Sequence, residues 1–543
     1  MKKTFVRILA FLLVLTMSFS MVACGEKAPE AAPEAAPEAA PEAAPEATPE
    51  VAPEGEEREH VELVFYTHVP EVLPGYEKTM AAVNEYLKEK LNTTVDFRIY
   101  SQATYKEAVN PAFMSGDEMD CLLVGSTGVD FSSNVPKNAF IDISDYIDTY
   151  LPGTKALLPE AAWEAYAYND GIYGICSIKD LSNQLGFYTN DTLLNDLGIE
   201  FPADTYYTYK DLVPFFYEVQ AARDAKYPEK AGQPLLHIGE IGNSIYFDFY
   251  DFFVGSYGTP LVITGIPGLQ DYAGIKSGEE VTSYFYTEEF REYCQIIKEL
   301  RDNGLIQFEY SIEEYSPIFE AGDAIGSVVW GDLAVDRAAR GFNFDPTMYY
   351  ANGAVLMTSG MLAAGFALPV QCSNVERTLE VIELMNTDQY LATMMHFGPE
   401  GIGWNDADND GVLEFEGTEN DPSLDYLDKC WHQWYGFALG AMTASKAPAG
   451  YPADFADRIF EMNKNGADSG NLGFSFDATN VQTELAACNA VMDEYMGTFN
   501  FGTASDLDAT IDEFVNKLKA NGLDTIIAEC QTQLTEWRAA NGK

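Results

Sequence analysis

Short apolar runs alternate with amphipathic segments along the N-terminal half of the chain. Residues 61–66 form an apolar run typical of a buried strand, and residues 76–91 carry apolar side chains at helical spacing. Residues 94–100 and 120–124 have the pattern of two further strands. This alternation predicts an α/β fold with a mostly parallel sheet, whose ligand would bind beyond the carboxyl ends of the strands.

The part of the chain that carries these patterns is too long for one sheet. A single hydrophobic core stops growing at about 250–300 residues, and residues 59–543 exceed that length. We therefore expect two α/β lobes with a cleft between them. Residues 246–253, which are rich in aromatic side chains, are expected to form a helix packed into the second lobe.

The N-terminus has the pattern of an export signal. Basic residues precede residues 8–21, an apolar stretch that is short for a membrane span. Residues 21–25, Met-Val-Ala-Cys-Gly, resemble a bacterial lipobox, so we expect residues 1–23 to be a signal peptide and Cys24 to be diacylated. Two acyl chains give stable membrane attachment. An ordinary cleaved signal with an incidental cysteine is the alternative.

Residues 24–58 are expected to be a tether. Proline followed by glutamate recurs every four residues from Pro29 to Pro53. Proline at this density blocks helix propagation, and the mutually repelling glutamates favour an extended chain. The segment therefore reads as a spacer between a membrane and a folded domain, with a proline-rich ligand for a partner module as the alternative.

Charge and cysteine content narrow the choice of partners. The chain has 32 Lys+Arg against 85 Asp+Glu, a formal net charge of −53. Nucleic acids are polyanions, so we expect no nucleic-acid partner. Apart from Cys24, the cysteines are odd in number and far apart, which argues against a disulfide framework and a zinc site and favours buried free thiols.

Several motifs together carry a family resemblance. Residues 116–120 read Gly-Asp-Glu-Met-Asp, residues 170–194 include Asp-Gly-Ile-Tyr-Gly-Ile and Gly-Phe-Tyr-Thr-Asn-Asp, and residues 321–332 run from Ala-Gly-Asp-Ala-Ile-Gly to Trp-Gly-Asp. Residues 473–537 hold the most specific piece, from Gly-Phe-Ser-Phe-Asp to Gln-Thr-Gln-Leu-Thr-Glu-Trp. In this order the motifs resemble the extracellular solute-binding lipoproteins (family 1) of bacterial carbohydrate ABC importers, with the additional C-terminal domain of LipO-like lipoproteins.

The resemblance implies a periplasmic-binding-protein-like α/β fold, in which two α/β lobes are joined by a three-segment hinge around a ligand cleft. Lobe one would comprise residues 59–180 and 361–405, and lobe two residues 186–355 and 430–543, with a C-terminal domain at about 440–543. Such proteins close on their ligand by hinge bending.

The resemblance also implies function and location. We expect a monomeric binding protein and not an enzyme, held by its lipid anchor on the outer face of the membrane of a Gram-positive-type cell. It would deliver a carbohydrate, in particular an oligosaccharide, to the transmembrane subunits of an ABC permease.

A sugar site needs aromatic rings for the apolar ring faces and carboxylates or amides for the hydroxyls. The resemblance brings Trp330 to the sugar, and Asp332 lies on the same loop. The other candidates follow predicted strands or lie at the crossings between lobes: Tyr66, His68, Ser126, Thr127, Asp130, Asp180, Asn183, Ser359 and Met361. A capping or core role is the alternative for each of them.

One loop matches the opening of an EF-hand-like calcium site. Carboxylates stand at positions one, three, five and nine: Asp406, Asp408, Asp410 and Glu414. Position twelve, a bidentate glutamate in that pattern, is Gly417. Bound Ca²⁺ is one hypothesis for this loop, and an acidic β-hairpin turn is the other. The binding function itself requires no cofactor.

Other functions stay open at this point. Peptides are alternative ligands for a transport lipoprotein, because aromatic and carboxylate side chains serve them equally. A secreted glycoside hydrolase would also have a cleft and paired carboxylates, although the sequence holds no Gly-x-Ser-x-Gly, no His-Glu-x-x-His and no P-loop. A surface lipoprotein that adheres to polysaccharide would need no hinge.

Overall fold

The computed structural model describes residues 58–183, 185–204, 209–236, 250–256, 259–266, 278–306, 322–330, 346–350, 354–433, 440–448, 451 and 453–543. The signal peptide, the tether up to residue 57 with Cys24, and Asp332 lie outside the described residues. The backbones of Trp330 and Asn183 are described, but their side chains are not.

The first sheet has five strands in the order β2-β1-β3-β14-β6. Its strands are β1 (Val61–Val69), β2 (Thr93–Ser101), β3 (Cys121–Val124), β6 (Ile175–Cys176) and β14 (Gly365–Ala367). β1 is parallel to β2 and β3, whereas β14 is antiparallel to both of its neighbours, β3 and β6. The strands predicted near residues 61, 94 and 120 are confirmed, and the expected parallel arrangement holds on the β1 side of the sheet.

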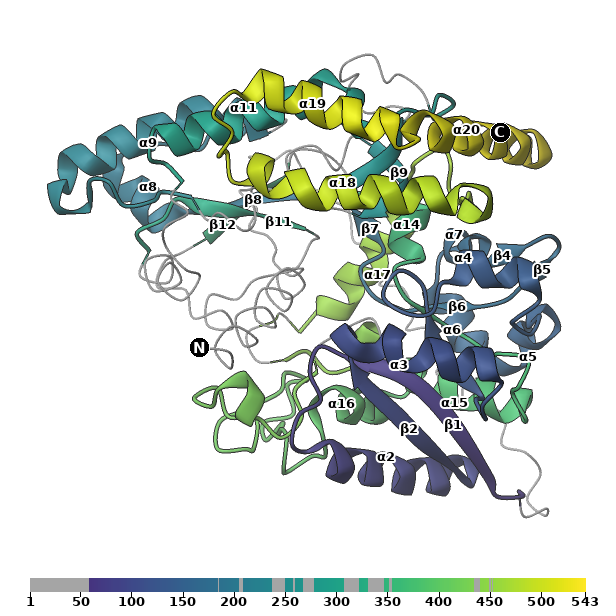
Figure 1. The fold of residues 1–543 in the computed structure, drawn as a ribbon. Helices are drawn as coiled ribbons and strands as arrows, with labels where there is room; N and C mark the ends of the chain where they lie inside the picture. Colours follow the sequence, from purple (N-terminus) through teal and green to yellow (C-terminus); the bar gives the residue numbers. More distant parts are fainter. Residues whose placement is uncertain are drawn as a thin grey trace, which may run out of the picture.

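Helices pack around this sheet to form the first core. α2 (Tyr76–Leu91) is the predicted helix, and it ends at Asn92, whose left-handed backbone (φ 49°) lets its N–H bond Lys88 O. The others are α3 (Gln102–Ser115), α15 (Val375–Thr387) and α16 (Gln389–Phe397). Buried apolar residues of β1, β3 and α15, among them Leu63, Leu122 and Leu379, share one contiguous core. Figure 1 shows α2, β1 and β2 in purple at one end of the molecule.

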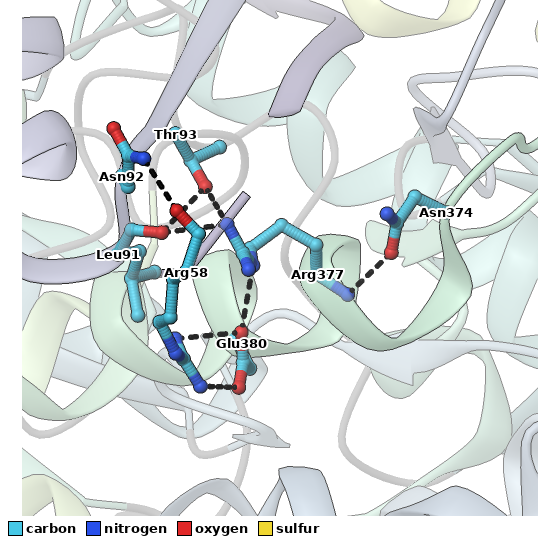
Figure 2. A network of polar contacts seen from close by, with 7 residues as sticks. All are labelled: Arg58, Leu91, Asn92, Thr93, Asn374, Arg377 and Glu380. Carbon is cyan, nitrogen blue, oxygen red and sulfur yellow. Dashed lines mark hydrogen bonds and ion pairs between the residues drawn. The ribbon is translucent and has the colours of Figure 1, made fainter. Parts of the chain in front are cut away.

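A charged network fixes the start of the described chain to lobe one (Figure 2). Both terminal nitrogens of Arg58 donate to Glu380, at 3.2 and 2.7 Å. Arg377 Nε donates to the same carboxylate at 2.9 Å, and its Nη1 donates to Leu91 O and to Thr93 Oγ1 at 2.6 and 2.7 Å. Because β1 and β2 begin here, the network lies at the amino-terminal edge of the first sheet.

The second core is built on two antiparallel arrangements. β8 (Leu185–Asn190) lies between β11 (Gly326–Trp330) and β12 (Pro346–Tyr350), and β9 (Tyr250–Ser256) pairs with β10 (Thr259–Gly265). The helix expected over residues 246–253 is wrong for its described part, because residues 250–253 belong to β9. Aromatic side chains favour strands, which explains why this run forms β9.

The helices of the second core include the C-terminal part of the chain. They are α8 (Asp191–Leu197), α9 (Val213–Lys226), α11 (Glu288–Asp302), α18 (Gln482–Asn500), α19 (Leu507–Ala520) and α20 (Leu523–Asn541). Phe290 of α11 contacts Phe499 of α18 and Phe514 of α19, with ring centroids 5.3 and 5.8 Å apart. Figure 1 shows these C-terminal helices, in yellow, at the end opposite to α2.

Three short strands join the two cores. β7 (Ser182–Asn183), β13 (Val355–Leu356) and β15 (Ala467–Asp468) form one small sheet in the order β15-β13-β7. Leu181, before β7, belongs to the first core and Phe187, after it, to the second. This sheet is the three-segment hinge expected from the resemblance.

The third hinge strand bears on the lobe boundaries. Cys430, Trp431 and Ala441 pack in the first core, and α17 (Phe455–Asn465) leads directly into β15. The contacts therefore favour a lobe two that resumes near residue 466 and not at residue 430, and we propose this boundary in place of the earlier one.

The described residues also form several smaller helices and strands. They are α4 (Phe131–Asn134), α5 (Ile147–Tyr150), α6 (Pro152–Leu157), α7 (Glu160–Ala165), β4 (Ala167–Tyr168), β5 (Gly171–Ile172) and α14 (Thr358–Met361). All seven cysteines of the described residues are free, and all but Cys372 are buried, as expected. None of the helices among the described residues combines the length and apolar character that a bilayer crossing needs.

Candidate ligand-binding site

The loop after β3 is fixed against the turn that follows α14. Ser126 N donates to Leu362 O at 3.0 Å, and Thr127 N donates to Ala363 O at 3.2 Å. Both hydroxyls, Ser126 Oγ and Thr127 Oγ1, also donate to Ala363 O, at 3.2 and 3.1 Å. The two hydroxyl oxygens keep their acceptor capacity, so this edge can receive hydrogen bonds from a polar ligand.

His68 lies beside this loop near the carboxyl end of β1. Its side chain is fully buried, and its ring packs edge-on against Tyr105 with the centroids 5.3 Å apart. Burial lowers the pKa of His68 to about 3. The imidazole is therefore neutral at physiological pH, with one nitrogen as donor and the other as acceptor.

Two of the candidate residues near this loop, Tyr66 and Asp130, make contacts within the protein. Tyr66 is 3% exposed, stacks on Tyr100 with ring centroids 6.4 Å apart, and its hydroxyl accepts a hydrogen bond from Arg98. Asp130 is the N-cap of α4, and its Oδ1 accepts from Ser133 N at 2.6 Å. These contacts favour the core alternative for Tyr66 and the capping alternative for Asp130.

α14 contributes Ser359 and Met361 to the same region. Met361 is fully buried, and its carbonyl accepts a hydrogen bond from Tyr166 Oη at 3.3 Å. The Ser359 hydroxyl is buried without a hydrogen-bond partner among the described residues. A buried polar atom of this kind has a free-energy cost that a ligand could remove, which keeps Ser359 among the candidates.

Asp180 lies where the first hinge segment begins. Asn463 of α17 bonds the residues on both sides of it: its Oδ1 accepts from Leu181 N at 2.7 Å, and its Nδ2 donates to Lys179 O at 2.6 Å. Burial raises the pKa of Asp180. The backbone on both sides of Asp180 is thus fixed at the hinge.

The structure therefore gathers part of the expected set. His68, Ser126, Thr127, Ser359 and Met361 meet around the carboxyl edge of the first sheet and α14, on the lobe-one side of the hinge. Nothing in the described residues tests the side chains of Trp330, Asp332 and Asn183.

Two residues that the sequence analysis did not single out lie in this region. Trp163 of α7, which packs against α14, has a buried indole nitrogen without a partner among the described residues. Thr358 Oγ1 accepts from Gly473 N at 2.8 Å and donates to Asn471 O at 3.3 Å, so it links α14 to the chain after β15. Neither residue has a signal in local sequence, because the surroundings of each depend on how distant segments meet.

The acidic loop at residues 406–414 brings three carboxylates together. One oxygen each from Asp406, Asp408 and Asp410 lies within 4.8 Å of the others. The Asp406 side chain is 3% exposed, whereas Asp408 and Asp410 are exposed. Such a set of hard oxygen ligands fits a cation of the Ca²⁺ type.

The same loop is closed as a hairpin. Asn405 and Glu414 exchange backbone hydrogen bonds of 2.9 and 2.8 Å, and Glu414 Oε2 accepts from Ala407 N at 3.4 Å. Asn409 (φ 59°) and Gly411 (φ 84°) take the left-handed backbone that the turn requires. The backbone of the loop is thus a hairpin, and the carboxylates of Asp406, Asp408 and Asp410 still lie close together.

Comparisons with known proteins agree with this fold. A carbohydrate ABC transporter substrate-binding protein of Streptococcus pneumoniae is 22% identical over 472 residues, which cover 85% of this chain and 88% of that protein. The crystal structure of the N-glycan transport solute-binding protein NgtS of S. pneumoniae matches with a TM-score of 0.69 and 18% identity, covering 88% of this chain and 99% of that one.

A further solved structure and one family model also match the chain. An S. pneumoniae substrate-binding protein, FusA, has been solved as an EF-hand mutant with fructo-nystose, and it matches with a TM-score of 0.54 and 17% identity over 88% of this chain and 100% of that one. The family described as "Domain of unknown function (DUF3502)" matches residues 471–539.

The last match spans α18, α19 and α20, where the most specific motif lies. The resemblance drawn from the motifs is therefore confirmed: the chain has the two-lobe fold of extracellular solute-binding proteins and is similar over most of its length to a carbohydrate ABC transporter substrate-binding protein.

Proposed function

We propose that this protein is the substrate-binding component of an ABC importer and captures a carbohydrate by closing its two lobes. The observation that carries the proposal is the hinge sheet β15-β13-β7, which joins two separate cores. The similarity to a carbohydrate ABC transporter substrate-binding protein over 85% of the chain supports the same function. Capture by a bending hinge requires no chemical step, so we propose no catalytic activity.

The ligand class we propose is an oligosaccharide. The structures named for NgtS include a complex with Man5GlcNAc, and the FusA structure holds fructo-nystose, so proteins of this fold bind extended sugars. In this chain Ser126, Thr127 and Ser359 would supply hydrogen bonds to sugar hydroxyls. Trp330 would stack on a sugar ring from lobe two.

Closure would place these groups on both sides of one sugar. Lobe one carries the Ser126 loop and α14, and β11 brings Trp330 from the second core. The cost of ordering the lobes is repaid only when ligand contacts form on both sides, so ligand and closure are coupled. The closed form would then be the one that docks on the permease.

We further propose that the mature protein begins at the diacylated Cys24 and stands off the outer face of the cell membrane on the tether of residues 24–58. The lipobox-like residues 21–25 and the proline repeat support this placement. A monomer is the expected form of such a receptor.

We also propose that the acidic loop binds Ca²⁺ through Asp406, Asp408 and Asp410. The grouping of three carboxylates within 4.8 Å supports it, as does the EF-hand named in FusA. Backbone oxygens and water would complete a coordination sphere of six to eight ligands, because the glutamate at position twelve is missing.

The function is tested on residues 24–543 with Cys24→Ser, which removes the lipid. Melting temperatures are measured with a panel of mono- and oligosaccharides, peptides and Ca²⁺ in separate arms, because a ligand that binds only the folded state raises the melting temperature. An oligosaccharide shift that Trp330→Ala abolishes is the expected result. If only peptides raise the melting temperature, the proposed carbohydrate ligand is wrong. If an oligosaccharide is shortened during incubation, the protein is a glycoside hydrolase and the proposed binding function is wrong.

A further inference from the structure

A lysine from elsewhere in the chain already contacts the acidic loop. Lys446 lies 40 residues after Asp406, and its Nζ donates to Asp406 Oδ2 at 2.5 Å. The Lys446 side chain is 24% exposed and that of Asp406 is 3% exposed. One oxygen of the residue at position one of the loop is therefore paired with an ammonium group.

The backbone of this lysine is fixed next to the loop. Lys446 N donates to Thr393 Oγ1 of α16 at 3.0 Å. The following residue, Ala447, accepts a hydrogen bond from Leu413 N at 2.8 Å and pairs with Val412. Because the chain is held on both sides of Lys446, its ammonium group stays within reach of the loop.

The other oxygen of the same carboxylate points to a missing ligand. Asp406 Oδ1 is buried and makes no hydrogen bond of good geometry among the described residues, although the backbone N–H groups of Asp410 and Gly411 lie near this carboxyl group. It belongs to the side chain that groups with Asp408 and Asp410 within 4.8 Å. A buried carboxylate oxygen without a hydrogen bond of good geometry is costly, and a cation among the three aspartates would satisfy it.

The ammonium group lies near an aromatic ring while it is bonded to Asp406. Lys446 Nζ lies 5.5 Å from the centroid of the Trp404 ring, within cation–π distance. Trp404 is 1% exposed, and its Nε1 donates to Gly398 O at 2.8 Å, so the ring is fixed. The lysine can therefore leave Asp406 and keep a favourable contact over the indole.

We propose that Lys446 is a tethered competitor for the divalent cation, so that Ca²⁺ and the ammonium group exchange at Asp406. The inference rests on the calcium site proposed above. Without metal, Lys446 neutralises Asp406 and stabilises the loop. With metal, repulsion between the two cations moves the ammonium group toward Trp404. Lys446 thereby weakens calcium binding and sets the Ca²⁺ concentration at which the loop fills.

The test is calcium titration by calorimetry on residues 24–543 carrying Cys24→Ser. The parent protein is compared with Lys446→Met and Lys446→Gln, and with Lys464→Met as a matched control. Lys464 also lies over an aromatic ring, at 5.7 Å from the Phe460 centroid, and its loss changes the net charge equally. Circular dichroism and melting temperature without calcium establish that each variant is folded.

We expect both Lys446 variants to bind Ca²⁺ about tenfold more tightly than the parent, because a nearby positive charge has been removed. Lys464→Met should bind as the parent does. Equal affinities in the parent and the Lys446 variants would overturn the competition and leave the calcium site standing, as would an equal gain in Lys464→Met. No binding in any variant would overturn the calcium site and the inference together.

Discussion

The Ser469 hydroxyl donates a hydrogen bond to Asp251 Oδ2 at 2.5 Å, and both side chains are fully buried. Ser469 directly follows the hinge strand β15, and Asp251 belongs to β9 of the second core. The pair therefore joins the third hinge segment to lobe two. Burial raises the pKa of Asp251 to about 7, and the nearby Asp468 adds to the effect.

This raised pKa predicts a pH-dependent stability. The folded state binds more protons than the unfolded state between the unfolded pKa of about 4 and the folded pKa, so the contribution of Asp251 is complete below pH 4 and is lost as pH rises through 7. Asp251→Asn should flatten this slope and stabilise the protein at pH 8 by up to about 4 kcal/mol. Urea unfolding at pH 5 and pH 8 measures it, and an unchanged slope in the variant would contradict the assignment.

Asn463 is expected to be essential for the first hinge segment. Asn463→Ala removes the two backbone contacts that flank Asp180 and should lower the free energy of unfolding by about 2–3 kcal/mol, because buried backbone groups lose their partners. Asn465→Ala is the matched control, since Asn465 Nδ2 bonds only Glu461 on its own helix in the described contacts. Equal losses in both variants, measured by urea unfolding, would show that Asn463 has no special role.

Substitution of Ser359 distinguishes a ligand-binding role of its hydroxyl from a structural role. Without ligand, Ser359→Ala should leave the melting temperature unchanged or raise it slightly, because it removes a buried hydroxyl without a partner. With the oligosaccharide found in the panel, the same variant should bind about tenfold more weakly, the effect of one lost hydrogen bond. A variant that binds sugar as the parent does would remove Ser359 from the site.

The two arginines of the charged network at the start of the described chain should contribute unequally to the free energy of unfolding. Arg377→Ala should cost about 2 kcal/mol, because Arg377 is 12% exposed and also bonds Leu91 O and Thr93 Oγ1. Arg58→Ala should cost below about 1 kcal/mol, because Arg58 is 41% exposed and solvent screens its ion pair. Thermal unfolding of both variants checks the order, and a larger loss for Arg58 would refute it.

The sequence predicted those helices and strands whose apolar spacing is regular over their own length. The apolar spacing of residues 76–91 predicted α2 at its observed bounds, since one face of that helix packs on the sheet. The helix predicted over residues 246–253 is wrong for residues 250–253, because aromatic side chains suit a pleated strand as well as a buried helix face. The antiparallel β14 had no signal either, since its direction is set by the return of the chain from the hinge.

The sequence predicted which kinds of side chain a ligand site would need, and only some of their positions in the fold. Ser126 and Thr127 follow a buried strand, which is where a parallel sheet places its ligand edge. Tyr66 is buried, and sequence alone does not reveal this, because residues in one strand alternate between faces and the face that the helices cover is not known. Lys446 was missed because its contact with Asp406 joins segments 40 residues apart.

The network of Arg58, Arg377 and Glu380 has a mechanical consequence. The tether would join the folded protein at the amino-terminal edge of β1 and β2, whereas the Ser126 loop and the end of β1 lie at the carboxyl-terminal edge. A pull along the tether would pass through Glu380 into α15 and the first core, without loading β7, β13 or β15. With the anchor proposed above, force on the tether would therefore leave the hinge free to bend.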